Sequence, residues 1–152
     1  MLLSELLSAD LVKIPLDGRT KADVLRELVG LVVATHPGLD ADAVLASVLQ
    51  REAELSTGIG GGVAVPHGRT PLVDDLLIAA GVSAAPVEYE ALDAAPVRLF
   101  FLLVSPESAA GLHVKALSRI SRVLRRDALR ERLLASASVA AFLAIVSEAE
   151  AA

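Results

Sequence analysis

The sequence predicts a three-layer α/β sandwich, in which helices cover both faces of a mixed sheet. Its regular segments follow one another in the order β-α-α-β-β-β-α-α-α. The apolar run from Leu99 to Val104 is typical of a central strand buried on both faces, and such strands need helices on either side. No internal repeat and no linker rich in proline or serine divides the 152 residues, so one domain spanning residues 1–152 is expected.

The composition excludes several classes of protein. The chain is 54% hydrophobic and 22% charged, which is typical of a globular domain rather than a disordered segment. Its 14 basic and 19 acidic residues give a net charge of −5, which argues against general binding to nucleic acid or to anionic membranes but leaves room for a local basic patch. There is no cysteine, which excludes disulfides, thiolate metal sites and cysteine nucleophiles.

The chain has no pattern for export or membrane insertion. Its start, MLLSELLSADLV, has Glu5 and Asp10 where a secretion signal would have Lys or Arg. The strongest continuous apolar run, residues 99–104, is far shorter than the roughly 18 residues that indicate a membrane span. We therefore expect a cytoplasmic protein that does not insert into the membrane.

Turn and capping residues set the bounds of the expected elements. Thr20, with Asp23 three positions later, is typical of a capping box at the start of a helix, and Pro37 would end that helix. The C-terminal tail from Ser147 is rich in Ala and Glu and is expected to fray. The expected strands cover residues 11–16, 63–65, 76–82 and 97–104, and the expected helices begin at Thr20, at Asp40 (ending near Arg51), near Leu112, at Asp127 and at Ser138.

A glycine-rich segment lies in the middle of the chain. Residues 56–62 read STGIGGG, a composition that neither helix nor strand tolerates well, so a loop is expected. It is not a nucleotide-binding loop, because G-x-x-x-x-G-K-[ST] is absent and a G-x-G-x-x-G frame begun at Gly58 meets Val63 in place of the third glycine. Dense glycines still leave backbone N–H groups free to approach an anion, with Arg51 before the loop and Arg69 after it.

His67 is the strongest candidate for chemistry. It follows a predicted short strand and lies between Pro66 and Gly68, a stiff turn with little bulk over the imidazole. The unperturbed imidazole pKa of about 6.5 leaves a nitrogen lone pair available near neutral pH, as a nucleophile, a base or a metal ligand. A phosphoryl group on His67 would meet the loop amides and the flanking guanidinium groups. The alternative is a Pro-His-Gly turn with a purely structural role.

The other two histidines have different settings. His36 ends a helix just before Pro37, where a cationic side chain favours the helix dipole, so no function is assigned to it. His113 lies at the edge of an apolar helix face, where it is either simply packed or, beside His67, orients a phosphoryl group. A metallohydrolase built on His67, His113 and Asp93 is a further alternative, although no H-x-x-x-H or H-E-x-x-H spacing supports it. A serine hydrolase would lack its G-x-S-x-G motif.

Several motifs follow one another along nearly the whole chain. They are Arg51-Glu52, Ser56 to Gly60, Gly62 to Gly68, Leu92-Asp93, Pro96-Val97, Leu99 to Val104, Ser105-Pro106-Glu107, and His113 to Leu117 with Leu124. Together they resemble the type-2 enzyme IIA domains of the bacterial phosphoenolpyruvate-dependent phosphotransferase system (PTS), the branch that includes fructose, mannitol and nitrogen-regulatory proteins. One departure is Ala94, because many members have Gly after the Asp.

The resemblance implies a fold of the phosphotransferase/anion transport protein type and a phosphohistidine carrier without cofactor or metal. His67 would accept a phosphoryl group from the phosphohistidine of HPr or of its nitrogen-branch equivalent. His113 and Arg51 match the second histidine and the neighbouring arginine of the family's active site and are the other predicted catalytic residues. The predicted phosphate environment consists of Thr57, Gly58, Gly68 and Arg69.

Two uses of such a carrier stay open. In sugar transport the phosphoryl group passes to a cysteine or histidine on a IIB domain and then to the sugar, whereas in nitrogen regulation the domain binds target proteins according to its phosphorylation. Another alternative is an interaction module of the same fold that never carries phosphate. The intact set of His67, Arg51 and His113 argues against that module. Phosphoryl transfer needs mainly positioning and charge compensation, which fits a chain without nucleotide or metal motifs.

Overall fold

A computed structural model of the chain describes residues 2–151 and shows one mixed sheet of six strands. The strand order is β1-β5-β6-β3-β2. Strand β4 also pairs with β6, on the same edge as β3 but farther along the strand. Strands β3 and β4 are parallel to β6, whereas β5 is antiparallel to it. The strands are β1 (Val12–Leu16), β2 (Gly58–Gly60), β3 (Val63–Ala64), β4 (His67–Thr70), β5 (Leu77–Val87) and β6 (Val97–Pro106).

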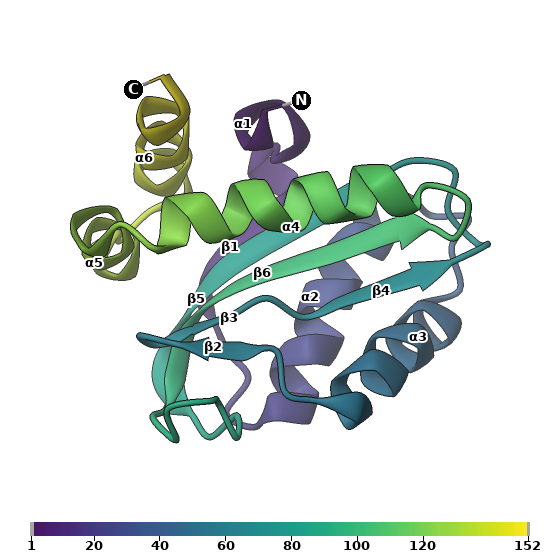
Figure 1. Cartoon of the computed structure of the whole chain (residues 1–152), viewed down its shortest axis with the longest axis horizontal. Coiled ribbons are helices and arrows are strands. Elements are labelled where there is room, and N and C mark those ends of the chain that lie inside the picture. Colours follow the sequence, from purple (N-terminus) through teal and green to yellow (C-terminus); the bar gives the residue numbers. More distant parts are fainter. Residues whose placement is uncertain (1, 152) are drawn as a thin grey trace.

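Helices cover both faces of this sheet (Figure 1). Helices α2 and α3 pack on one face, mainly against β5 and β4, and α4, α5 and α6 pack on the other, against β6 and β1. This arrangement confirms the predicted three-layer α/β sandwich. Across residues 2–151, no helix is both long enough and apolar enough to cross a bilayer. The helices are α1 (Leu3–Leu6), α2 (Lys21–Thr35), α3 (Ala41–Glu54), α4 (Ala110–Leu124), α5 (Asp127–Ala135) and α6 (Val139–Ala151), with a 3-10 turn, η1 (Ala9–Leu11), before β1.

The central strand and the first long helices form where the sequence predicts them. Residues 99–104 of β6 are each at most 1% exposed, as expected of a strand covered on both faces. The Thr20 hydroxyl accepts a hydrogen bond from the Asp23 amide at 3.2 Å, and the Asp40 carboxylate accepts from two amides of the first turn of α3 at 3.0 and 3.3 Å. Such caps satisfy amides that have no partner within the helix. Helix α3 continues to Glu54, beyond its predicted end.

The C-terminal helix is ordered by contacts with the start of the chain. Helix α6 extends to Ala151, which corrects the expectation that the tail frays from Ser147. The Glu150 carboxylate accepts hydrogen bonds from two amides at the start of α1, at 2.7 and 2.8 Å, and lies 3.6 Å from the Arg119 guanidinium. The tail therefore caps α1, a short helix that the sequence pattern does not predict.

Four further elements differ from the sequence expectations. The glycine segment contains β2, which forms a hairpin with β3 rather than a plain loop, and positive φ angles of 97°, 67° and 80° at residues 60–62 make its tight turn possible. His67 begins strand β4, although the sequence predicts a turn there. The sequence predicts Asp127 as the cap of α5, but Asp127 is the first residue of this helix and Arg126 occupies the N-cap position without a side-chain cap. Strand β5 runs to Val87, past its predicted end.

Ala94 adopts a left-handed backbone conformation, with a φ of 60°. A side chain at such a φ crowds the backbone and costs roughly 1–2 kcal/mol, whereas glycine adopts it freely. We therefore expect Ala94→Gly to raise the free energy of unfolding by about 0.5–1 kcal/mol, measured by urea denaturation. Ala95→Gly, at a position without this strain, is the control and should not stabilise the protein. A lower urea midpoint for Ala94→Gly would contradict the explanation.

Candidate functional site

A cavity of about 790 Å³ opens where the end of α3, strand β4 and the start of α4 meet. Strand β4 lies at an edge of the sheet, so side chains from helices on both faces can reach it. Five predicted site residues line this cavity, and Thr57 and Gly58 do not. The lining residues are Ser47, Gln50, Arg51, Glu54, His67, Gly68, Arg69, Glu107, Ala110, His113, Val114 and Leu117.

The backbone determines which nitrogen of His67 is available for reaction. His67 begins β4 and pairs with Leu103 of β6, and its Nδ1 lies 2.8 Å from the carbonyl oxygen of Val65. Because a carbonyl oxygen only accepts hydrogen bonds, Nδ1 carries the proton and Nε2 keeps its lone pair. No residue in the range 2–151 forms a hydrogen bond with Nε2. The half-buried ring therefore presents Nε2 as a nucleophile.

Gly68 allows β4 to lie close to α3. A Cβ at this position would stand 2.9 Å from the Ser47 hydroxyl oxygen and 3.1 Å from the backbone of Ser47 and Val48, which leaves no room for it. Side chains alternate along a strand, so His67 and Arg69 project to the opposite side, toward α4. Gly68 thus fixes the distance between His67 and the helix that carries Arg51.

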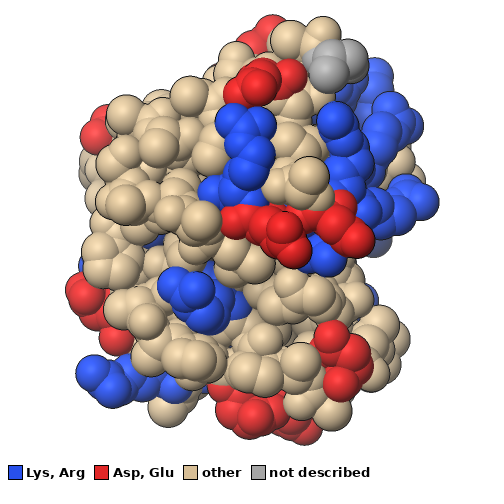
Figure 2. All heavy atoms as spheres, turned by 90° about the vertical axis from the view of Figure 1, so that its left-hand side faces the viewer, with Lys and Arg blue, Asp and Glu red and all other residues tan. Residues whose placement is uncertain are grey.

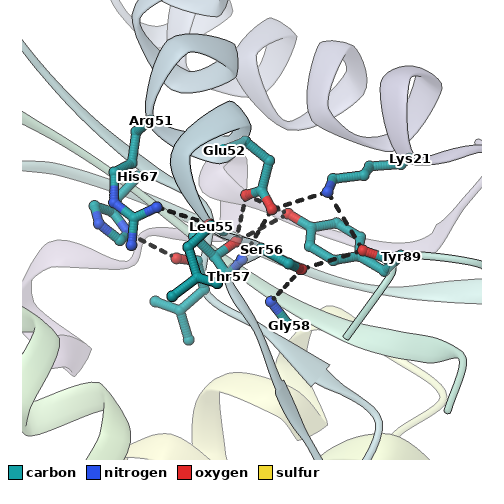
Figure 3. A network of polar contacts seen from close by, with 10 residues as sticks. Lys21, Arg51, Glu52, Leu55, Ser56, Thr57, Gly58, His67 and Tyr89 are labelled. Atoms are coloured by element: carbon teal, nitrogen blue, oxygen red, sulfur yellow. Dashed lines mark hydrogen bonds and ion pairs between the residues drawn. The ribbon is translucent and has the colours of Figure 1, made fainter. Parts of the chain in front are cut away.

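Two guanidinium groups belong to the cavity. Arg51 lies in the last turn of α3, where its Nη1 donates a hydrogen bond to the Leu55 carbonyl at 2.8 Å and its Nε lies 4.0 Å from the Glu54 carboxylate. Figure 3 shows this guanidinium beside the ring of His67. Arg69 follows His67 by two residues on β4 and is exposed. A guanidinium stays protonated in proteins, so both groups supply permanent positive charge.

His113 packs against His67 from the other side of the cavity. The two ring centroids are 5.2 Å apart, with 61° between the ring planes. Nδ1 of His113 lies 2.5 Å from the hydroxyl oxygen of Ser105, which is fully buried near the end of β6. This contact holds the orientation of the His113 ring. Ser105 is a site residue that sequence reasoning missed, and its only signal is its place in the Ser105-Pro106-Glu107 motif.

Both imidazoles are neutral near pH 7. Burial lowers the pKa of His67 below its usual 6.5, and the charge of Arg51 acts in the same direction, although the hydrogen bond to the backbone carbonyl opposes them. The pKa of His113 is lowered to about 4, and burial is the largest cause. The nearby His67, Arg69 and Arg51 lower this pKa further. A neutral nucleophilic nitrogen beside fixed positive charges is suited to binding and receiving an anionic group such as phosphoryl.

A buried polar network holds the end of α3 next to Arg51 (Figure 3). The Glu52 carboxylate is 7% exposed and accepts hydrogen bonds from the Thr57 amide at 2.8 Å, the Thr57 hydroxyl at 2.5 Å and the Tyr89 hydroxyl at 3.0 Å. It also lies 2.9 Å from the Lys21 ammonium. Burial alone would raise the pKa of Glu52, but the hydrogen bonds from Thr57 and the Lys21 ammonium outweigh it and hold this pKa below its usual value. The network joins α2, α3 and the segment around Tyr89.

Thr57 and Gly58 do not line the cavity that contains His67, so their place around the phosphate stays a prediction. The Thr57 hydroxyl is committed to the buried network, and the Gly58 amide donates to the Ser56 hydroxyl at 3.2 Å. At the hairpin tip, the Gly61 amide donates to the Asp93 carboxylate at 3.1 Å. The Gly58 and Gly61 amides, which the sequence suggests as donors to an anion, therefore already donate hydrogen bonds within the protein. In the chain, strand β3 separates the hairpin tip from His67.

His36 and Asp93 also lie away from this cavity. Asp93 contacts the hairpin tip and is not brought together with His67 and His113. Within the part of the chain that the structure describes, no group of three or more His, Cys, Asp or Glu residues is placed to hold a metal ion. The metallohydrolase alternative therefore lacks its ligand set. His36 is the C-cap residue of α2 and borders a separate cavity of about 470 Å³.

Known proteins resemble the chain over most of its length. The family described as "Phosphoenolpyruvate-dependent sugar phosphotransferase system, EIIA 2" matches residues 5–149. The PTS system fructose-specific EIIABC component of Bacillus subtilis is 36% identical over 148 residues, which are 97% of this chain, and the chain spans only 23% of that relative's length. A nitrogen regulatory protein of Pseudomonas aeruginosa is 36% identical over 140 residues, covering 92% of this chain and 90% of the relative.

Solved structures have the same fold. The nitrogen regulatory protein IIA-Ntr from Neisseria meningitidis has a TM-score of 0.88 and 30% identity, covering 95% of this chain and 98% of the other. Enzyme IIA for mannitol from Escherichia coli, solved in complex with phosphorylated enzyme IIB, has a TM-score of 0.78 and 19% identity, covering 93% of this chain and 97% of the other. These matches confirm the family that the sequence motifs resemble: the chain belongs to the EIIA type-2 family of the phosphoenolpyruvate-dependent sugar phosphotransferase system.

Proposed function

We propose that the chain is a phosphohistidine carrier, in which His67 accepts a phosphoryl group from a histidine-phosphorylated carrier protein of the HPr type. One observation carries the proposal: Nδ1 of His67 donates to the Val65 carbonyl at 2.8 Å, so Nε2 keeps its lone pair inside the cavity. Arg51 and Arg69 border the same cavity and would offset the charge of the arriving group. Phosphoryl transfer relies mainly on such positioning and charge compensation.

The transfer conserves protons between the two proteins. The Nε2 lone pair of His67 forms a bond to phosphorus while the P–N bond of the donor phosphohistidine breaks and its electron pair returns to the donor ring. The donor ring, protonated on its other nitrogen, leaves as neutral imidazole. His67 becomes a phosphorylated imidazolium, whose Nδ1 proton stays hydrogen-bonded to the Val65 carbonyl. The ring of His113, whose centroid lies 5.2 Å from that of His67, is proposed to donate a hydrogen bond to a phosphoryl oxygen.

The recipient is a IIB domain or a regulated protein. The Bacillus subtilis relative carries the name EIIABC, and the mannitol enzyme IIA was solved with phosphorylated enzyme IIB, which supports a IIB partner. The Pseudomonas aeruginosa relative is a nitrogen regulatory protein, which supports regulation. Both relatives are 36% identical to the chain, so sugar transport and nitrogen regulation both remain within the proposal. We place the reaction in the cytoplasm.

Incubation with phosphoenolpyruvate, enzyme I and HPr tests the proposal. Intact mass is expected to show one added phosphoryl group per chain, which acid treatment removes because the P–N bond is labile. Omission of HPr should abolish the uptake. A chain that stays unmodified at saturating phosphorylated HPr would contradict the proposal and would favour the alternative, an interaction module of the same fold that carries no phosphate.

His113→Ala is expected to slow phosphoryl uptake by about 10- to 100-fold while leaving it measurable, because one hydrogen-bond donor to the transferring group is lost. Rapid-quench measurement of transfer from phosphorylated HPr checks this. Ser105→Ala, which removes only the group that orients His113, should show a smaller loss in the same direction. If both directions of transfer kept their wild-type rates in His113→Ala, this histidine would be merely packed.

A further inference from the structure

The positive charge of the chain is concentrated on α4 and α5. Residues 115–132 contain 7 of the 14 basic residues and 2 of the 19 acidic ones, a net charge of 7 − 2 = +5, and the rest of the chain has 7 − 17 = −10. Between residues 110 and 126 no acidic residue occurs. Figure 2 shows Lys and Arg side chains gathered toward one edge of the face that carries α5 and the end of α4.

Several of these cations have no anionic partner within residues 2–151. The cations that form ion pairs with Glu or Asp are Arg119, Arg130 and Arg132. The exposed cations without such a pair in that range are Lys115, Arg122, Arg125 and Arg126. Lys115 and Arg122 lie on α4, and Arg125 and Arg126 lie in the junction that follows it. Unpaired like charges close together repel one another, and an external anionic surface would relieve this repulsion.

This basic face is continuous with the cavity that holds His67. A groove of about 450 Å³ runs along α4 and is lined by Lys115, Arg119 and Arg122 among others. Val114 lines both this groove and the cavity of His67. Two apolar side chains are exposed near this junction, Leu112 at 39% and Val114 at 65%. Apolar residues next to a charged, solvent-accessible rim are typical of protein–protein interfaces.

We propose that the outer face of α4 and the junction that follows it, from Leu112 to Arg126, docks an acidic surface of a protein that exchanges the phosphoryl group with His67 or responds to its phosphorylation. The inference rests on the proposed function. A stable protein interface buries about 800 Å² on each partner, so a protein that covers the cavity of His67 must extend over neighbouring surface. The α4 face offers that surface, and its charge selects a partner that carries carboxylates.

A protein fits this face better than a bilayer or a nucleic acid does. A bilayer lying on α4 would also cover the cavity that Val114 borders and would block access to His67. A nucleic acid would place its phosphates along the whole face, including positions next to the phosphoryl group, which carries the same charge. A protein can confine its carboxylates to the part of its surface that faces Arg122 through Arg126. Arg122 lies about 12 Å along α4 from Val114, and Arg125 and Arg126 follow the end of that helix. That separation exceeds the Debye length of about 10 Å at 0.1 M salt.

The test uses binding to a chain that carries His67→Ala, so that its outcome does not depend on phosphorylation. The labelled chain is titrated with oligoglutamate, with vesicles of phosphatidylglycerol and with a short DNA duplex, and backbone amide signals are followed by NMR. Oligoglutamate is expected to shift signals of residues 112–126. The added changes Arg122→Glu, Arg125→Glu and Arg126→Glu should weaken this binding by about tenfold or more.

The control carries Arg19→Glu and Arg26→Glu, the same type of change at exposed positions preceding and within α2 on the opposite face of the sheet. Its affinity for oligoglutamate should stay within about twofold of the parent's. Signal shifts confined to other regions, or equal weakening in the control, would overturn the proposal. Tighter binding of vesicles or DNA than of oligoglutamate on α4 would also overturn it. If the α4 face binds oligoglutamate as expected but the wild-type chain takes up no phosphoryl group, only the proposed function is rejected.

Discussion

His67→Ala is expected to take up no phosphoryl group from phosphorylated HPr, whereas the wild-type chain takes up one. His67 is the cavity residue whose Nε2 is both nucleophilic and accessible, because its Nδ1 proton is held by the Val65 carbonyl and its ring is only half-buried. His113 does not replace it, because its side chain is 7% exposed and its Nδ1 is engaged by Ser105. Intact mass after incubation with phosphoenolpyruvate, enzyme I and HPr measures this result.

Two further variants make the result interpretable. His36→Ala removes the histidine at the end of α2, outside the cavity, and should keep full phosphoryl uptake. His67→Gln keeps a side chain of similar size, so it should fold as the wild type does and still take up nothing. Phosphoryl uptake near the wild-type level in either His67 variant would move the acceptor to another residue.

Glu52→Ala is expected to lower the free energy of unfolding by about 3–5 kcal/mol, because breaking a buried ion pair leaves the partner charge uncompensated. The variant leaves the Lys21 ammonium and the hydroxyls of Thr57 and Tyr89 without their common acceptor. Tyr89→Phe removes a single hydroxyl from the same network and should cost only about 1–2 kcal/mol. Urea denaturation followed by circular dichroism compares the variants. A loss below about 1 kcal/mol in Glu52→Ala would contradict this role of the network.

The same network predicts a dependence of stability on pH. The pKa of Glu52 is held below its usual 4.5 in the folded protein, so between the folded and unfolded pKa values the folded chain binds fewer protons than the unfolded chain. Its contribution to stability is therefore complete above the unfolded pKa and is lost as the pH falls through the folded pKa. Glu52→Gln should show a shallower decline of unfolding free energy in acid than the wild type. Equal slopes for both proteins would contradict the assignment.

Local signals account for the elements that the sequence predicts well. Thr20 and Asp40 cap their helices through contacts within three residues, and the apolar run of β6 by itself indicates a buried central strand. Strand β4 has no comparable pattern, because His67–Thr70 reads HGRT and takes its extended form from pairing with β6. Helix α1 likewise depends on a distant partner, the Glu150 carboxylate.

The site residues show the same contrast between local sequence signals and tertiary contacts. His67, Gly68 and Arg69 are adjacent in the chain. Arg51 and His113 are distant in sequence, their catalytic roles are implied by the family resemblance, and the fold brings them into the same cavity. Thr57 and Gly58, which the resemblance also implies, do not line this cavity; the Thr57 hydroxyl donates to Glu52 and the Gly58 amide donates to Ser56. The pairings of Glu52 with Tyr89, 37 positions apart, and of Ser105 with His113 across β6 and α4 arise only from tertiary packing.

The position of the phosphoryl group on the His67 ring tests the central claim most directly. The chain is labelled with ¹⁵N in its histidine rings, phosphorylated through HPr, and examined by NMR for coupling between phosphorus and ring nitrogen. The account predicts phosphorus bonded to Nε2 of His67, with Nδ1 still protonated against the Val65 carbonyl. Phosphorus on Nδ1, or on any residue other than His67, would contradict it.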